Sequence, residues 1–374
     1  MQDVNPASLQ PVVAWGAFVL AFVFGFVGNR TNFCTMGAVS DVVNMGDWNR
    51  MRMWLLAIAV AIAGANALEL AGLIKLSNSI YPSANFTWLS YLVGGALFGI
   101  GMTLGSGCGS KTLIRVGGGN LKSLVVLVFM AIAAYMTLRG LFGSVRVGVL
   151  EPVSVQLASG QDLPSLLASW LGAERRAMEI LAALAVGGAL AAFALAKREF
   201  RQFDYLLGGI VVGLVIVGGW YVSGRLGYVA EHPDTLQEAW VATNTGRMES
   251  LSFVAPQAFL LELLMFWTDK TRIVTFGIAS ALGVIAGSAA YALATKTFRL
   301  ESFRDAPDML RHIVGGILMG FGGVVALGCT IGQGITGFST LAAGSILTFA
   351  AIIAGAAGTM KYEYWRMMRE GITA

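Results

Sequence analysis

Residues 94–108 read Gly-Gly-Ala-Leu-Phe-Gly-Ile-Gly-Met-Thr-Leu-Gly-Ser-Gly-Cys, and residues 315–329, which lie 221 positions further on, read Gly-Gly-Ile-Leu-Met-Gly-Phe-Gly-Gly-Val-Val-Ala-Leu-Gly-Cys. Seven of the fifteen positions are identical: five glycines, one leucine and one of the three cysteines in the chain. Glycine is common here, so isolated matches would mean little, but seven matches in one register without a gap indicate a duplication. The sequence therefore predicts two related halves.

The composition of the whole chain indicates that its solvent is lipid. Of 374 residues, 56% are hydrophobic and 12% are charged, and the mean hydropathy is +0.71, which excludes an ordinary water-soluble fold. The 48 glycines suit close helix packing in a bilayer. The net charge of +4 arises from Lys and Arg in short clusters between apolar runs, a pattern that indicates membrane topology and no nucleic-acid partner.

Nine apolar runs are long enough, or nearly long enough, to cross the roughly 30 Å hydrocarbon core of a bilayer. They lie at residues 12–27, 54–73, 89–104, 121–138, 178–196, 205–222, 273–294, 312–327 and 341–358. The first run has no basic segment before it and no small-residue cleavage site after it, so we expect a retained span. These runs predict an all-α polytopic membrane protein with about nine transmembrane helices.

Four further apolar stretches are too short or too rich in glycine to span a bilayer. They lie at residues 32–43, 107–118, 253–267 and 328–338. Backbone of this kind is tolerated at membrane depth only where protein or a water-filled cavity covers it. We therefore expect four short re-entrant helices.

The repeat and the span count together predict the domain organisation. We expect one membrane domain over residues 1–374, with repeat one at about 12–138, a linking insertion and span at about 139–200, repeat two at about 204–360 and a tail at 361–374. The fifth span makes the second copy enter from the opposite side, which is the inverted repeat common among transporters. Of the 25 Lys and Arg residues, 16 fall on the side of the C-terminus, so the positive-inside rule predicts a cytoplasmic C-terminus and an external N-terminus.

Each repeat places a cysteine immediately before a polar, glycine-rich turn. Glycine lets the backbone turn sharply, and the free N–H groups that open a short helix can replace part of an anion's hydration shell. Three cysteines are an odd number and lie far apart in the sequence, which predicts free thiols, no disulfide framework, no metal site and no cofactor. The candidate path residues are Cys34, Cys108, Cys329, Gly107, Gly109, Gly328, Thr330, Gln333, Lys111 and Arg115.

Thiols suit passage of an anion better than fixed charges do. A thiol in apolar surroundings stays neutral and offers a weak S–H donor. A conduit must bind an ion strongly enough to admit it and weakly enough to release it, and a fixed charge would bind an anion more tightly than a thiol does. The other interpretation is that buried cysteines only pack, but three of them in broken polar turns favour a site. Cys34 has no counterpart after the sixth span, so we expect an asymmetric site.

Several neighbouring residues have two interpretations. Lys111 and Arg115 either attract anions toward Cys108 or mark the cytoplasmic boundary. Glu69 and Glu262 lie near the ends of apolar segments, where we expect interfacial positions. The glycines at 94, 95, 99 and 101 are expected to permit close helix contact.

Three motifs carry a resemblance to a known family. They are Phe33-Cys34-Thr35-Met36-Gly37-Ala38, the paired Gly-Cys turns at Cys108 and Cys329, and Glu249-Ser250-Leu251-Ser252-Phe253-Val254-Ala255-Pro256. In these motifs, and over nearly its whole length, the chain resembles the YeeE/YedE-type bacterial sulfur transport proteins, whose characterised members take up thiosulfate.

The resemblance implies an hourglass-shaped permease of the bacterial inner membrane that is embedded in lipid and imports thiosulfate or a closely similar sulfur anion. It implies that Cys34, Cys108 and Cys329 pass the ion along by S–H contacts without covalent chemistry. It also implies a small TusA-type sulfur carrier as a cytoplasmic partner. Some relatives are associated with selenium metabolism, so a selenium analogue stays open as the substrate, and the insertion at 139–176 leaves the outer vestibule open.

Two other classes of function remain. A membrane sulfurtransferase would carry sulfur as a cysteine persulfide, but it needs an activating base, and neither His232 nor His312 neighbours a cysteine in the sequence. A structural or receptor-like membrane protein would use its cysteines only for packing. Transport is the prediction that accounts for the repeat and the cysteine turns together.

Overall fold

The computed structural model describes residues 6–233 and 235–372. Within this part of the chain, nine helical segments are long and apolar enough to cross a membrane: Ser8–Met45, Asn49–Leu70, Trp88–Gly117, Leu121–Arg139, Arg175–Leu195, Phe203–Leu226, Phe276–Ala294, Ala306–Val325 and Ala343–Arg369. Each corresponds to one predicted run. The prediction of an all-α polytopic membrane protein with about nine spans is therefore confirmed.

The individual elements have the following bounds. The helices are α1 (Pro6–Arg30), α2 (Thr35–Ser40), α3 (Asn49–Leu70), α4 (Trp88–Leu104), α5 (Gly109–Gly117), α6 (Leu121–Arg139), α7 (Leu141–Val145), α8 (Leu163–Leu171), α9 (Arg175–Ala182), α10 (Gly188–Leu195), α11 (Phe203–Tyr221), α12 (Ala255–Met265), α13 (Phe276–Ala294), α14 (Ala306–Val325) and α15 (Ala343–Ile372). Wider π-helical turns lie at Asp41–Met45, Arg146–Leu150, Ala183–Gly187, Val222–Leu226 and Gly332–Gly337, and 3₁₀ turns lie at Leu76–Asn78 and Arg198–Arg201. Two antiparallel strand pairs complete the set, β1 (Asn85–Phe86) with β2 (Val155–Gln156) and β3 (Tyr228–Val229) with β4 (Ala239–Trp240).

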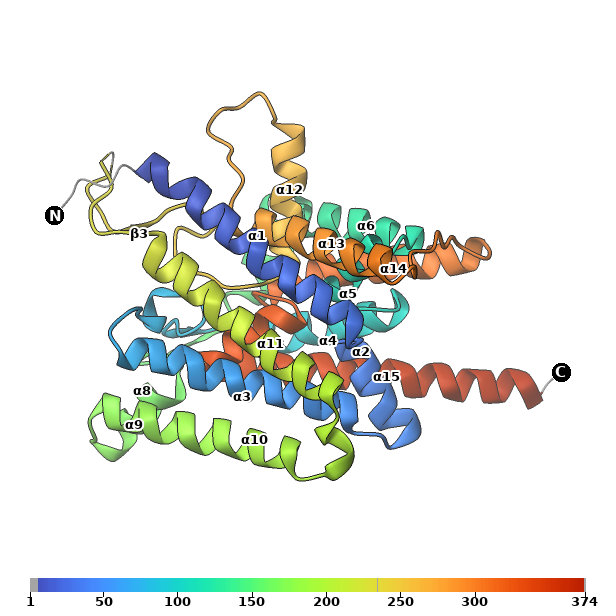
Figure 1. Ribbon diagram of the computed structural model, residues 1–374, viewed down its shortest axis with the longest axis horizontal. Coiled ribbons are helices and arrows are strands. Elements are labelled where there is room, and N and C mark those ends of the chain that lie inside the picture. Colours follow the sequence, from blue (N-terminus) through green and yellow to red (C-terminus); the bar gives the residue numbers. More distant parts are fainter. Residues whose placement is uncertain (1–5, 234, 373–374) are drawn as a thin grey trace.

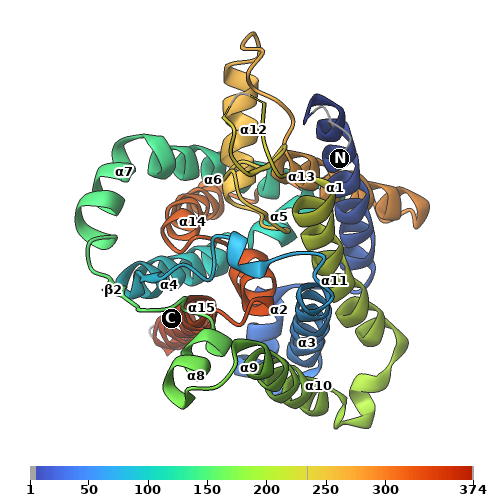
Figure 2. The same ribbon diagram turned by 90° about the vertical axis from the view of Figure 1, so that its left-hand side faces the viewer.

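Short helices form at all four of the predicted short stretches. They are α2, α5, α12 and the helical segment 330–339, which contains the turn Gly332–Gly337. Most residues of α5 and every residue of the turn are buried. Figure 2 shows α2 and α5 enclosed by the long helices. The long helices therefore surround α2, α5 and the segment 330–339, whereas α12 projects from the bundle.

Helices α4 and α14 pack against each other through reciprocal glycine contacts. A Cβ on Gly94 would lie 2.8 Å from the carbonyl oxygen of Gly322, and a Cβ on Gly315 would lie 2.8 Å from that of Gly101. The shift of 221 residues relates Gly94 to Gly315 and Gly101 to Gly322. Each contact is thus the counterpart of the other, and the glycines have the close-packing role expected of them.

The two ends of the bundle differ. Helix α1 begins at one end in Figure 1, and α15 ends at the other. Helix α15 continues past the predicted span, so residues 361–372 of the expected tail are helical and extend beyond the bundle, while residues 373–374 lie outside the described part of the chain. Helix α12 projects sideways from the bundle in both views and carries exposed Leu264 and Met265 at its outer end.

The linking insertion is folded onto the start of α15. Asp162 caps α8 by accepting a hydrogen bond from the backbone N–H of Ser165, at 3.0 Å. Gln161 accepts a bond from the backbone N–H of Gly344 (3.1 Å) and donates one to the Tyr91 hydroxyl (3.1 Å). These contacts hold the insertion against α4 and α15.

The glycine contacts lead to a stability prediction. In Gly322→Ala the new Cβ would lie 2.6 Å from the Gly94 carbonyl oxygen and 2.7 Å from the Phe98 nitrogen, so α4 and α14 must separate. We expect a loss of about 1–3 kcal/mol, measured as a lower Tm of the detergent-solubilised protein. Gly188→Ala is the control, because a Cβ there meets no atom within 4 Å. Equal Tm values for the two variants would contradict the packing argument.

Candidate functional site

All three cysteines lie directly before a short helix. Cys34 caps α2, Cys108 caps α5, and Cys329 precedes the helical segment 330–339. The carbonyl oxygen of each cysteine accepts the first hydrogen bond of its helix. These bonds come from the backbone N–H groups of Ala38 (3.0 Å), Thr112 (2.9 Å) and Gln333 (2.7 Å). The cysteines therefore occupy the helix ends where free N–H groups and the positive helix dipole favour an anion.

The two Gly-Cys turns have the same backbone structure. Ser106 and Leu327 have φ values of 58° and 57°, in the left-handed region. The N–H of Gly107 donates to the Met102 carbonyl at 2.9 Å, and that of Gly328 donates to the Gly323 carbonyl at 2.8 Å. This is the hydrogen-bond pattern that closes a helix with a left-handed residue. It ends α4 and α14 sharply and redirects the chain into the next short helix.

The three thiols are free, buried and in contact with hydrogen-bond donors. The exposed fraction is 5% for Cys34 and 0% for Cys108 and Cys329. The Cys34 Sγ accepts from the backbone N–H of Gly37 at 3.3 Å, and the Cys108 Sγ lies 3.3 Å from the Ser110 Oγ. The sulfur atoms are thus placed where a ligand would also meet backbone and hydroxyl donors.

Cys329 has the most donors around its sulfur. Its Sγ accepts from the backbone N–H of Phe253 at 3.3 Å and from that of Gly332 at 3.4 Å, and the Ser252 Oγ lies 4.0 Å away. Two further predicted path residues end in orphan atoms, because the Thr330 Oγ1 and the Gln333 Oε1 are buried without a hydrogen-bond partner. Buried polar atoms of this kind call for a ligand or water.

A chain of contacts connects the three cysteines. The Thr35 Oγ1, next to Cys34, lies 3.9 Å from the Cys108 Sγ. Gly109, next to Cys108, packs so closely on Phe253 that a Cβ there would lie 2.7 Å from the Phe253 carbonyl oxygen. Phe253 in turn donates to Cys329. Thr35, Ser252 and Phe253 are not among the predicted site residues, although all three belong to the motifs that carry the family resemblance.

Lys111 and Arg115 face the end of the molecule where α4 ends and α14 begins. The buried Lys111 Nζ donates to the Asn32 Oδ1 at 2.6 Å, and the Arg115 Nη1 donates to the Ser106 carbonyl oxygen at 2.6 Å. The remaining predicted residues, Gly107 and Gly328, leave room for neighbouring side chains. A Cβ on Gly107 would lie 3.2 Å from the Lys111 side chain, and a Cβ on Gly328 would lie 3.1 Å from the Gln333 side chain. Nine of the ten predicted residues belong to the two Gly-Cys segments by sequence, and the contacts of Thr35 with Cys108 and of Asn32 with Lys111 bring the Cys34 segment to the first of them.

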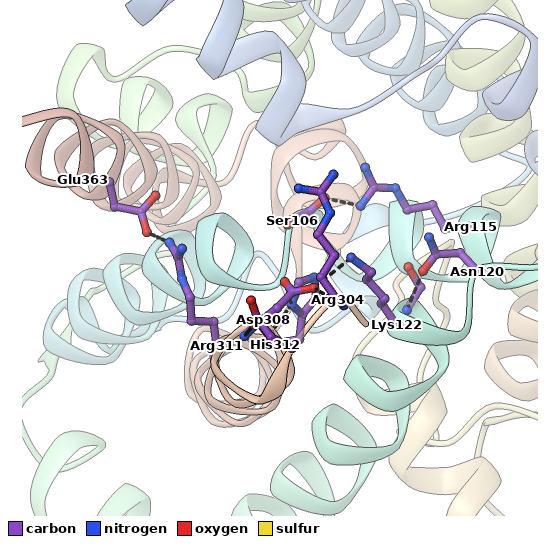
Figure 3. A network of polar contacts seen from close by, with 11 residues as sticks. Ser106, Arg115, Asn120, Lys122, Arg304, Asp308, Arg311, His312 and Glu363 are labelled. Carbon is purple, nitrogen blue, oxygen red and sulfur yellow. Dashed lines mark hydrogen bonds and ion pairs between the residues drawn. The ribbon is translucent and has the colours of Figure 1, made fainter. Parts of the chain in front are cut away.

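A cationic cavity of about 450 Å³, the inner cavity, opens at this end. Its lining includes Lys111, Arg115, Lys122, Arg299, Glu301 and Asp308. Lys122 pairs with Asp308 at 2.8 Å, as Figure 3 shows, whereas Lys111 and Arg115 form no ion pair with a carboxylate of the described chain. The inner cavity therefore has an excess of positive charge beside Cys108.

A second cavity, of about 360 Å³, shares Ser106, Asp308 and His312 with the inner cavity. Its wall includes Arg311 of α14 and Glu363 of α15, which form an ion pair. Figure 3 shows this pair on the side of His312 and Asp308 away from Arg115. The ion pair ties the long C-terminal helix to the rim of the inner cavity.

The opposite end has a smaller cavity of about 280 Å³, the outer cavity. It is lined by Ile80, Ser83, Asn85, Thr87, Ser90, Tyr91, Glu151, Arg247, Val325 and Leu327. Leu327 lies two residues before Cys329, just as Ser106 of the inner cavity lies two residues before Cys108. Each Gly-Cys turn thus contributes to a cavity, at opposite ends of α4 and α14.

Other charged groups form ion pairs with one another. Glu262 lies 3.0 Å from an Arg272 nitrogen and 3.8 Å from an Arg139 nitrogen, and Glu69 lies 3.9 Å from an Arg175 nitrogen. Glu69 lies at the end of α3, whereas Glu262 is buried in the short helix α12 beside the end of α6. In the part of the chain that the structure describes, no group of three or more His, Cys, Asp or Glu residues is placed to hold a metal ion.

Comparisons with known proteins agree with the resemblance seen in the sequence. The chain is 27% identical over 324 residues to the thiosulfate transporter TsuA of Escherichia coli (strain K12), which covers 84% of each chain. It is 25% identical over 357 residues to the thiosulfate transporter TsuA of Spirochaeta thermophila, which covers 91% of this chain and 96% of that one. The family model described as sulphur transport matches residues 30–358, and the chain therefore belongs to the sulphur transport family.

Proposed function

We propose that this protein imports thiosulfate, or a closely similar sulfur anion, through a path formed by its three cysteines and without a covalent step. The family and the names of the two relatives support transport of such an anion. The main support for this path is a chain of contacts that runs from Cys329 through Phe253 and Cys108 to Thr35. The chain lies between cavities at opposite ends.

The geometry suits a relay of weak contacts. The anion would exchange water for S–H groups and for the backbone N–H groups that open the three short helices. Lys111 and Arg115 lie within electrostatic range of the Cys34 thiol, but their donor groups are bonded to Asn32 and to the Ser106 carbonyl. Binding that is shared among neutral donors can be released again, which is what conduction requires.

The reciprocal contacts of α4 and α14 support an inverted repeat and an hourglass shape. A pair of helices related by a two-fold axis must make every contact twice, and Gly94 with Gly322 and Gly315 with Gly101 are such a pair. The matching turns at Ser106 and Leu327 then face opposite ends. Two cavities that narrow toward cysteines follow from this symmetry.

The charge distribution supports an orientation in the bacterial inner membrane. The 16 Lys and Arg residues of the richer side belong to the end where α15 finishes, so this end is cytoplasmic and the start of α1 is external. The cationic inner cavity would then receive the anion. A TusA-type carrier would meet the anion at the same face, as the family resemblance implies.

A sulfurtransferase is the alternative with an observable signature. A nucleophilic cysteine needs a base or a cation close to its sulfur, and the Lys111 amine is held by Asn32. Mass spectrometry of the protein after turnover distinguishes the two functions, because relay transport leaves the thiols unmodified and an enzyme leaves a persulfide. Selenium-containing analogues, added as competitors of uptake, define the substrate range.

The first prediction concerns the thiols. We expect replacement of Cys34, Cys108 and Cys329 together by Ala to reduce thiosulfate uptake into proteoliposomes to the level of empty liposomes, because the relay loses every S–H contact. Radiolabelled thiosulfate measures the initial rate. Ser144→Ala, on the exposed surface of the linking insertion, is the control and should transport normally. Uptake that survives in the triple variant would refute the cysteine path.

The second prediction concerns the inner cavity. We expect Arg115→Gln and Lys111→Gln each to lower the maximal uptake rate roughly three- to tenfold, which corresponds to a loss of about 1 kcal/mol of anion attraction. Lys361→Gln removes an exposed cation of the same face and should have no such effect. If all three variants behave alike, the two cations mark only the membrane boundary.

A further inference from the structure

Glu249 is a carboxyl group that the relay of thiols does not use. Its Oε1 atom is fully buried and forms no hydrogen bond in the structure. The backbone of Asn244 is the hydrogen-bond donor to this carboxyl group. One oxygen is therefore satisfied and the other is an orphan, and an orphan oxygen of this kind is costly unless a ligand completes it.

The backbone of Glu249 is held firmly beside the outer cysteine. Ser223 donates to the Glu249 carbonyl oxygen, and the Glu249 N–H donates to the Ser223 Oγ at 3.1 Å. Only three and four residues further on, Ser252 and Phe253 contact the Cys329 Sγ. The backbone of Glu249 is thus held in the same short segment of chain whose residues Ser252 and Phe253 contact Cys329.

Tyr81 connects Glu249 with the same site from another direction. Its hydroxyl lies within electrostatic range of both Glu249 and Cys329. Its ring packs on the helical segment after Cys329, where a Cβ on Gly337 would lie 2.7 Å away. Ile80 and Arg247, which neighbour Tyr81 and Glu249 in the sequence, both line the outer cavity. Along the chain, Glu249 therefore lies between Arg247 of the outer cavity and the residues that contact Cys329.

The groups around Glu249 do not neutralise it by charge. The π-helical turn Val222–Leu226 contributes the Ser223 hydroxyl, while Arg225 of that turn is exposed. The Arg247 guanidinium donates to the Ser79 carbonyl oxygen at 3.4 Å. Burial raises the pKa of Glu249 to about 8, against a smaller lowering by the Asn244 hydrogen bond. At neutral pH the carboxyl group is consequently protonated and has an O–H without an acceptor.

We infer that Glu249 acts as a neutral acid on the outer approach to Cys329, where it donates a hydrogen bond to a fully ionised sulfur oxyanion. This inference rests on the proposed function. A protonated carboxyl favours an anion that carries no proton of its own, because the anion supplies the missing acceptor. Once ionised, the same group repels a dianion and leaves two buried negative charges close together.

The test is the dependence of KM on external pH in proteoliposomes with a fixed internal pH. A group that titrates at about 8 is roughly nine-tenths protonated at pH 7 and one-tenth at pH 9, so KM for thiosulfate should rise about tenfold between these values. Glu249→Gln keeps a neutral donor of the same shape, so its KM should stay near the value of the unmodified protein at pH 7 across the range. Glu249→Ala should show a raised KM without pH dependence.

Glu231→Gln is the matched control, an exposed glutamate of the same connection between α11 and α12, and should retain the tenfold rise. Infrared difference spectra of the unmodified protein against Glu249→Gln add a readout that is independent of transport, since the C=O stretch of a protonated carboxyl should be present at pH 7 and lost at pH 9. A tenfold rise that persists in Glu249→Gln, or the absence of this band, overturns the inference. If the unmodified protein shows no uptake above empty liposomes, the proposed function fails instead.

Discussion

The structure depends on hydrogen bonding of the backbone where helices α4 and α14 break inside the bundle. Away from water, an unpaired N–H or C=O costs several kcal/mol, so a chain can leave the helix only if another group takes over its bonds. The left-handed residues Ser106 and Leu327 redirect the last N–H groups onto the preceding carbonyls. The cysteine that follows in each turn starts the next short helix. The break is thereby satisfied without water, and after Cys329 the Gly332 N–H at the start of the new helix donates to the cysteine sulfur.

Close packing of the long helices follows from the same breaks. A short helix of nine residues, such as α5, can be buried only if the spans around it approach one another on their other faces. Gly94, Gly101, Gly315 and Gly322 remove the side chains that would keep α4 and α14 apart. The glycine pattern allows the close packing that the cysteine turn requires, which explains why the two occur together in both halves of the sequence.

Sequence patterns predict those parts of this architecture that depend on interactions between residues close together in the sequence. An apolar run indicates a span, and a Gly-Cys step after glycine-spaced helix indicates a break. The end of α15 is not predictable in the same way, because the helix continues past the last apolar window into a segment rich in charged and aromatic residues. The contacts of Phe253 with Cys329 and of Thr35 with Cys108 join residues 76 and 73 positions apart. No periodicity in the sequence encodes such pairs, and the orphan oxygen of Glu249 is visible only once its surroundings are known.

The contacts of the two symmetry-related cysteines also explain why the third cysteine has no mate. Beside Cys108, the Cys34 segment supplies the hydroxyl of Thr35, and beside Cys329 the hydroxyl of Ser252 and the N–H of Phe253 occupy the corresponding place. The half that contains Cys108 therefore has two thiols, and the half that contains Cys329 has one thiol with the Ser252 hydroxyl and the Phe253 N–H beside it. A sulfur oxyanion has a hard, oxygen-rich end and, in thiosulfate, a soft sulfur end. In the proposed path, hydroxyl or N–H donors lie beside the thiols in both halves, where they suit the oxygen atoms of such an anion. The half with two thiols offers the softer surroundings for its outer sulfur.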